Sequence, residues 1–219
     1  MNLYTSREVW IMDLTMLERN LTIVFEKPLS GLELSREELP ENFKDAEARS
    51  GDGGQLYLSS FRTGIEMIFT PNRLIVRDVR NEVLAEDLVP RLALMVQRKT
   101  DASVRAYGLN YIAEFPVKGN KAGRFLAERL LNIGQIEKVL SVAGANVRLE
   151  HREGELKYRL SLEPRWQDVE HDHCYANLNI HHEGSLPNDE AELRQQFRKG
   201  EQWFIEHLTR LFPDVLGKE

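Results

Sequence analysis

Alternation of apolar and polar residues recurs along the chain and predicts a sheet of antiparallel strands. In such segments successive side chains point to opposite faces, so that one face can pack on a core. Pro71 and Asn72 suit a tight turn, which makes the segments on either side of them neighbours in a meander. Strand patterns in the first half cover residues 20–26, 55–61, 64–70, 73–79 and 103–117.

Residues 145–182 predict three further antiparallel strands. Two alternating segments flank a turn at "REGE", which is typical of a hairpin, and "CYANLNI" follows as the third strand. The apolar positions of the hairpin are Val147, Leu149, Leu156, Tyr158, Leu160 and Leu162.

A period of 3.6 residues predicts helices between these strands. Ser35 and Glu38 have capping-box spacing and indicate a short helix over 35–49. Asp87 is placed to cap a second helix, and residues 122–144 form a third that glycines interrupt. The strongest helix pattern covers 187–212, with an apolar stripe at Leu193, Phe197, Gly200, Phe204, Leu208 and Leu211.

Together these elements predict an α+β fold. We expect antiparallel strands with helices packed on one face of the sheet and a long amphipathic helix at the C-terminus. One domain over 1–219 is the simplest organisation, and two similar sub-halves, 1–117 and 122–219, are the alternative.

Composition narrows the classes of function. The chain has 219 residues and a formal net charge of −6, which argues against nucleic acid as a partner because phosphate binding needs clustered Lys and Arg. The single cysteine forbids an intrachain disulfide. No long apolar segment occurs, so we expect a cytoplasmic protein without a membrane partner.

Histidines gather near the end of the chain. Strand parity would turn Cys174 toward the core and place His171 and His173 on the other face, about 6.6 Å apart. His181 would then lie about 26 Å from His173 and belong to the opposite end of the strand. Solvent-facing histidines are the favoured interpretation.

Two metal sites remain as alternatives to that interpretation. One combines His171 and His173 with Glu163, and the other combines His151 and His181 with Glu155. The favoured prediction has no metal and no cofactor, and the sequence assigns no catalytic residue.

Aromatic residues supply candidate contacts for a partner. Residues 103–115 form a strand that is apolar on both faces, with Tyr107 and Tyr111 on one of them. The chain's own second half is the favoured cover for that strand, and a partner subunit is the alternative. Trp166 lies in a polar loop and is the third candidate.

The segment "GLNYIA", residues 108–113, resembles the Gly-Leu-Arg-Tyr-Ile-Asn strand of a sporadically distributed bacterial family of uncharacterised proteins. An early strand that ends in Phe25 and Glu26 fits the same order of elements, and the resemblance covers about residues 20–213. Asn110 stands where the family has Arg, and Ala113 where it has Asn. The resemblance implies the fold and a bacterial or mobile-element origin, and no activity.

We therefore expect a non-enzymatic protein-interaction or assembly module of a bacterial cytoplasmic system, associated with mobile elements or defence. Its partner would be another protein or a second copy of the chain. A metal-dependent hydrolase that uses histidines at the sheet ends is the alternative. A small-ligand pocket between the sheet and the terminal helix is a third hypothesis.

Overall fold

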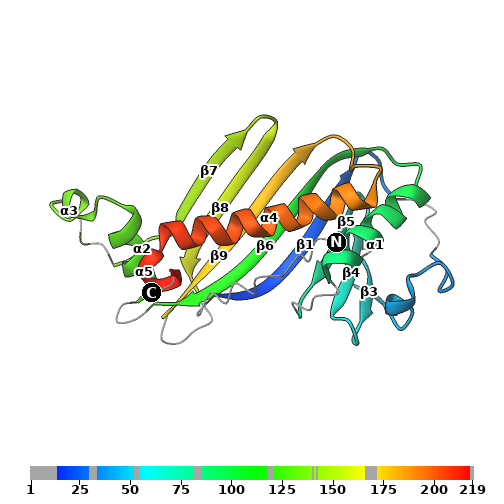
Figure 1. Ribbon diagram of the computed structural model, residues 1–219, viewed down its shortest axis with the longest axis horizontal. Helices are drawn as coiled ribbons and strands as arrows, with labels where there is room; N and C mark the ends of the chain where they lie inside the picture. The colour runs from blue at the N-terminus through cyan, green and yellow to red at the C-terminus, as the bar shows by residue number, and fades with distance from the viewer. Residues whose placement is uncertain are drawn as a thin grey trace, which may run out of the picture.

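The computed structural model describes residues 14–29, 34–51, 55–80, 85–117, 121–139, 141, 143–165 and 172–217. These residues form one antiparallel sheet of nine strands in the order β2-β3-β4-β5-β1-β6-β9-β8-β7 (Figure 1). The strands are β1 Thr15–Phe25, β2 Glu47–Ser50, β3 Leu56–Ser60, β4 Ile65–Thr70, β5 Arg73–Asp78, β6 Val104–Pro116, β7 Val147–Glu153, β8 Leu156–Pro164 and β9 His173–Glu183.

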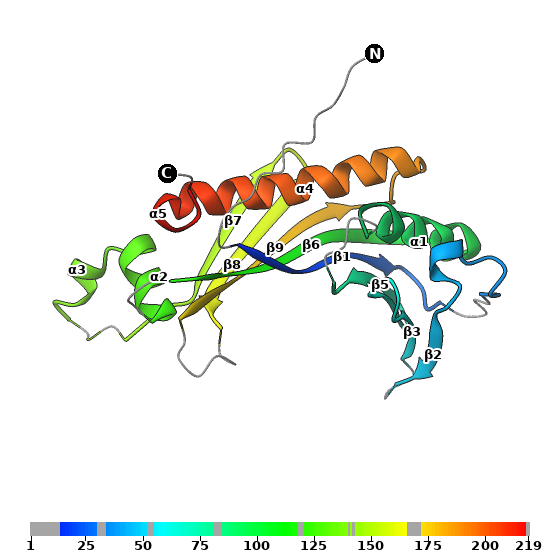
Figure 2. The same ribbon diagram turned by 60° about the horizontal axis from the view of Figure 1, so that its bottom comes forward.

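Two long helices, α1 (Ala85–Lys99) and α4 (Glu190–Leu211), cover one face of the sheet. Figure 2 shows the sheet arching beneath them, with its other face on the inside of the curve and, among the described elements, without a helix over it. The short elements are η1 Glu41–Phe43, α2 Ala122–Leu130, α3 Ile133–Ile136 and α5 Pro213–Leu216. No described helix has the length and apolarity needed to cross a membrane.

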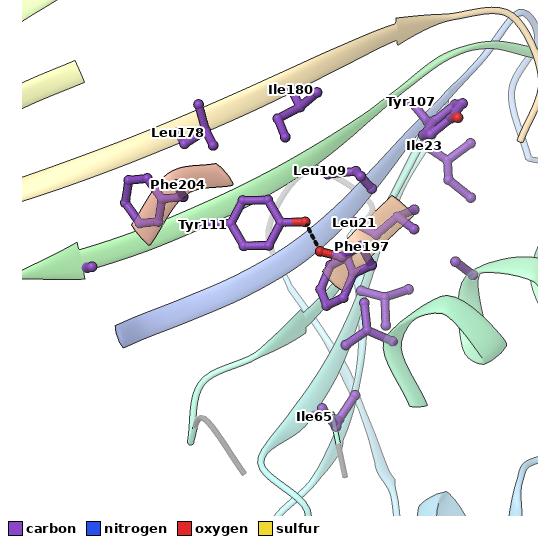
Figure 3. Close-up of a cluster of buried hydrophobic side chains, with 14 of the residues drawn as sticks. Leu21, Ile23, Ile65, Tyr107, Leu109, Tyr111, Leu178, Ile180, Phe197 and Phe204 are labelled. Carbon is purple, nitrogen blue, oxygen red and sulfur yellow. Dashed lines mark hydrogen bonds between the residues drawn. The ribbon is translucent and has the colours of Figure 1, made fainter. Parts of the chain in front are cut away.

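The core lies between α4 and the middle of the sheet (Figure 3). Phe197 and Phe204 of α4 pack on Tyr111 of β6, whose hydroxyl donates a hydrogen bond to the Phe197 carbonyl at 2.6 Å. Gly200 lies between them, where a Cβ atom would come within 2.5 Å of the Tyr111 hydroxyl. The helix therefore approaches the sheet closely because this position has no side chain.

The predicted α+β class is confirmed, as are the three antiparallel strands between residues 145 and 182. The helix expected over 35–49 is wrong, because only the three-residue turn η1 and the edge strand β2 form there. The Ser35 amide does donate to the Glu38 carboxylate at 3.0 Å, as in a capping box. Pro40 then stops the helix, since proline lacks the N–H that the next turn needs.

Two other helix predictions need smaller corrections. Helix α1 begins at Ala85, before the expected cap at Asp87, and it contains Pro90. The helix expected over 122–144 divides into α2 and the four-residue α3.

Candidate functional site

The concave face of the sheet carries the most distinctive polar surface of the described structure. Residues of the sheet surface opposite α4 surround a depression of about 520 Å³, which we call the open-face hollow. Its lining comes from six neighbouring strands, β5, β1, β6, β9, β8 and β7. The lining residues are Thr22, Val24, Arg73, Ala106, Tyr107, Gly108, Asn110, Arg148, Arg159, Ser161, Asn177, Asn179 and His181.

Three arginines line the open-face hollow, and the carboxylates of Glu150 and Glu183 lie next to its lining residues Arg159 and His181. Arg73, Arg148 and Arg159 contribute to its lining, and no described Asp or Glu does. Arg159 has a carboxylate neighbour in Glu150, at 3.0 Å, and both side chains are more than half exposed. Arg73 and Arg148 form no ion pair with the described residues, so their guanidinium groups remain available for an anion.

Three asparagines form a ladder across the sheet, and two of them, Asn110 and Asn179, line the open-face hollow. Asn179 of β9 donates a hydrogen bond to the Oδ1 atom of Asn110 at 2.6 Å, and Asn110 of β6 donates to Asn20 of β1 at 2.7 Å. Asn20 in turn donates to the Glu18 carboxylate at 2.7 Å. Asn20 and Asn110 are 90 positions apart in sequence, and Asn110 and Asn179 are 69 apart. The sheet register makes each pair direct cross-strand neighbours.

The carboxylate at the end of this asparagine ladder determines which way every amide points. Ionised Glu18 can only accept hydrogen bonds, so the Asn20 amide must turn its NH2 group toward it. Each following oxygen then accepts from the next NH2 group along the ladder. Arg77 holds Glu18 in place, at 3.4 Å, and binds Glu66 at 2.8 Å from its other side. At the far end, the Asn179 oxygen consequently faces away from Asn110.

The absence of a side chain at Gly108 leaves space for the Asn179 amide of the ladder. A Cβ atom at this position would lie 2.9 Å from the Asn179 amide nitrogen, closer than van der Waals contact allows. The glycine also forms part of the lining of the hollow. A side chain here would therefore displace the Asn179 amide and make the floor shallower.

The histidines of β9 divide between the two faces, as strand parity predicts. His181 lines the open-face hollow and lies 3.1 Å from the Glu183 carboxylate. His182 lies on the helix-covered face, where its ring stacks on Tyr107 at 4.2 Å between centroids. Cys174 is also on that face, and burial raises the pKa of its thiol to about 12.

Neither metal site considered from the sequence is assembled among the described residues. Among the described residues, no three His, Cys, Asp or Glu side chains are grouped to hold an ion. His151 pairs with Tyr158 and packs near Trp203 on the helix-covered face, whereas His181 lies on the opposite face. Glu155 lies exposed in the hairpin turn between β7 and β8.

The first of those sites is only partly described, since His171 lies outside the described residues. His173 is 2.7 Å from the Asp172 carboxylate, and the strand partner of Glu163 is Tyr175. The expected grouping of His173 with Glu163 is therefore replaced by a pair between neighbouring residues.

Of the three aromatic candidates for a partner contact, two belong to the core. Tyr111 is fully buried and Tyr107 is 4% exposed. Tyr107 donates a hydrogen bond to Gln196 of α4 at 2.9 Å, so the chain's own helix covers it. Neither tyrosine offers a surface to another protein, which corrects that expectation. Trp166 lies outside the described residues.

Comparisons with known proteins give limited information. No family model matches the sequence, and no curated protein matches it. The fold is similar to the structure of a rolling circle replication initiator protein from Geobacillus stearothermophilus, with a TM-score of 0.33 and 9% identity. The match covers 93% of this chain and 85% of that chain. A TM-score of this size carries no argument about activity.

Three expectations are corrected here. A non-enzymatic protein-interaction module gains no support, since α4 covers the aromatic face that suggested a partner. The sheet-end metal hydrolase loses its basis because His151 and His181 lie on opposite faces. The expectation that nucleic acid is not a partner is also wrong to rest on net charge. Net charge does not show how charges are distributed, and three arginines line one hollow.

Sequence reasoning missed the asparagine ladder, although a signal was present. Asn is depleted in strand interiors, yet "RNLTI", "GLNYI" and "NLNI" place one next to apolar residues in three separate strands. A polar residue in such a position needs a partner within the sheet. The pairing of β1 with β6 and of β6 with β9 supplies that partner.

Proposed function

We propose that this protein binds nucleic acid on the concave face of its sheet. The observation that supports the proposal best is the open-face hollow, which three arginines line without a described carboxylate in the lining. Guanidinium groups bind phosphate oxygens through two parallel hydrogen bonds and cannot lose their charge. Polar amides on the floor add donors and acceptors of the kind that base edges need.

The positions of the arginines match an extended anion better than a small one. Arg73 on β5 and Arg148 on β7 are separated by five strand-to-strand steps, which corresponds to about 24 Å of sheet. A single phosphate group cannot contact both arginines, whereas a phosphodiester chain can. The net charge of −6 does not oppose this binding, because repulsion from distant charges is screened beyond about 8 Å at physiological salt.

Fluorescence anisotropy with labelled single-stranded and hairpin oligonucleotides at low salt tests the proposal. Arg148→Ala and Arg73→Ala should each weaken binding about tenfold, the effect of losing about 1.4 kcal/mol of binding free energy. Arg210→Ala is the matched control: it removes the same charge from an exposed position on α4, across the sheet from the hollow.

The control variant should bind as tightly as the natural sequence. Failure of every oligonucleotide to bind at low salt would overturn the proposal. Equal losses in the Arg148→Ala and Arg210→Ala proteins would also overturn it, because they would place binding elsewhere or make it a nonspecific effect of charge.

A further inference from the structure

We infer that the open-face hollow takes single-stranded nucleic acid and that Asn177 and Asn179 select its bases; this inference rests on the proposed function. The arginines would hold phosphates at the sides of the hollow while the two amides of β9 contact base edges on its floor. Adenine is the base we expect them to prefer, because a carboxamide pairs with its N6 and N7 atoms through two hydrogen bonds.

The shape of the sheet favours base contacts with a single strand over base contacts with an undeformed duplex. Base edges of a double helix lie at the bottom of grooves in a convex cylinder, and narrow elements such as a helix or a two-stranded ribbon reach them. The hollow lies on the concave face of the sheet (Figure 2), and its lining from six strands includes both amides. An undeformed duplex placed there would present its phosphates to the floor. A strand with unpaired bases can bring its base edges to the floor without that deformation.

The spacing of the amides leads to the same conclusion. Asn177, Asn179 and His181 alternate along β9 on the open face, so consecutive side chains are about 6.8 Å apart. Successive phosphates of a stacked strand lie only about 3.4 Å apart along the axis. One base can therefore meet each side chain where the strand is unstacked and extended, as in proteins that recognise single strands.

The hydrogen-bond capacity of these amides is not used up within the protein. The Asn177 side chain makes no hydrogen bond with another described residue. Asn179 uses one N–H group on Asn110, and the direction of the ladder leaves its oxygen and its second N–H group unpaired. Each amide therefore has both a donor and an acceptor for a base edge.

Glu18 acts as a positioning residue in this arrangement. It does not line the hollow, but its negative charge fixes the Asn20 amide and, through Asn110, the Asn179 amide. Glu18→Gln would remove that constraint, because a glutamine amide can donate as well as accept. The ladder could then run in either direction, and Asn179 would present either its oxygen or its NH2 group.

The experiment measures the affinity of the full chain for four single-stranded homopolymers of equal length and for a hairpin duplex. The natural sequence should bind the single strands more tightly than the hairpin, and oligo(dA) at least about fivefold more tightly than the weakest homopolymer. Asn177→Ala and Asn179→Ala should reduce this discrimination to about twofold or less, while the salt dependence of binding stays unchanged. Glu18→Gln should also reduce discrimination without changing the salt dependence.

Asn188→Ala serves as the matched control, since Asn188 is exposed near the start of α4 and outside the hollow. Thermal unfolding of each variant separates a folding defect from a binding effect, and Asn177→Ala keeps the test valid even if Glu18→Gln unfolds. Equal binding of all homopolymers by the natural sequence, or tighter binding of the hairpin, would overturn this inference while leaving the proposed function intact. Absence of binding to any nucleic acid would overturn both.

Discussion

At the scale of single residues, the pKa values of two polar side chains on the helix-covered face shift in opposite directions. Arg19 contacts Asp78 at 2.9 Å and Glu201 at 3.3 Å. Burial alone would lower the pKa of Arg19, but the charges of Glu201 and Asp78 outweigh it and raise that pKa above its usual value. His182 has no such carboxylate among the described residues. Burial, together with the neighbouring His181, lowers its pKa from 6.5 to about 4.

His182 should therefore make the protein less stable in mild acid. The unfolded chain binds a proton at this position near pH 6.5, whereas the folded chain resists it until about pH 4. Stability that is fully present above pH 6.5 is lost as the pH falls through this window. In His182→Phe, which keeps a ring against Tyr107, the melting temperature should fall less between pH 6.5 and pH 4.

The test is a series of thermal melts of both proteins across that range. Trp203→Phe makes a useful control, because it alters an aromatic contact on the same face without removing a titrating group. Identical pH dependence of the natural sequence and His182→Phe would contradict the assignment of this effect to His182.

At the scale of elements, the contact between α4 and β6 positions the helix over the middle of the sheet. Gly200 allows the close approach, while Phe197 and Phe204 pack one turn away on either side. The aromatic side chains of α4 extend this contact toward the β7–β8 hairpin, where Trp203 stacks on Tyr158 at 4.6 Å. One helix therefore joins strands from both halves of the chain.

Gly200→Ala should destabilise the protein although alanine is the better helix former. The substitution gains about 1 kcal/mol of helix propensity. It also places a methyl group against the Tyr111 hydroxyl and Ile180, and overpacking of this kind costs about 1–3 kcal/mol. We expect a net loss of about 1 kcal/mol, seen as a lower midpoint of urea unfolding.

Gln202→Ala is the control for that substitution. Gln202 is exposed on the same helix, so alanine there should change the free energy of unfolding by less than about 0.5 kcal/mol. An increase in stability on Gly200→Ala would show that Tyr111 and Ile180 can move aside.

The sequence predicts an element well when the residues that determine it lie close together in the chain. Hydrophobic period located the β7–β8 hairpin, β9 and α4, and strand parity turned Cys174 inward, because these patterns are local. Pro40 and the short helix around it show where a local signal misleads. The open-face hollow could not be predicted in this way, since Asn20, Asn110 and Asn179 meet only after distant strands pair.

At the scale of the whole molecule, the two halves of the chain share one sheet, because β6 pairs along its length with β9. The open-face hollow crosses this junction, with Arg73 contributed from one side and Arg148 from the other. The single-domain organisation, the bacterial family resemblance and the cytoplasmic location stay predictions.

A binding surface of this kind predicts a specific salt dependence. Three arginines that neutralise three phosphates of a single strand give a slope of about −2 for the logarithm of affinity against the logarithm of salt concentration. Affinity should then fall roughly twentyfold between 50 and 200 mM salt. Oligonucleotide titrations over this range measure the slope, and Arg148→Ala should reduce its magnitude by about 0.7.

Arg210→Ala provides the comparison, since an arginine outside the hollow should leave the slope unchanged. A slope near zero for the natural sequence would mean that phosphates are not what the arginines bind.

The central position of β1 has a consequence for how the chain folds while it is being synthesised. Both neighbours of β1 come later: β5 begins at Arg73 and β6 at Val104, whereas β1 ends at Phe25. At about 5–20 residues per second, β1 emerges several seconds before either partner. β1 thus leaves the ribosome as an unpaired strand, ahead of both of its partners. Folding of the sheet has to wait for β5 and β6, which makes the early nascent chain the state most in need of protection from aggregation.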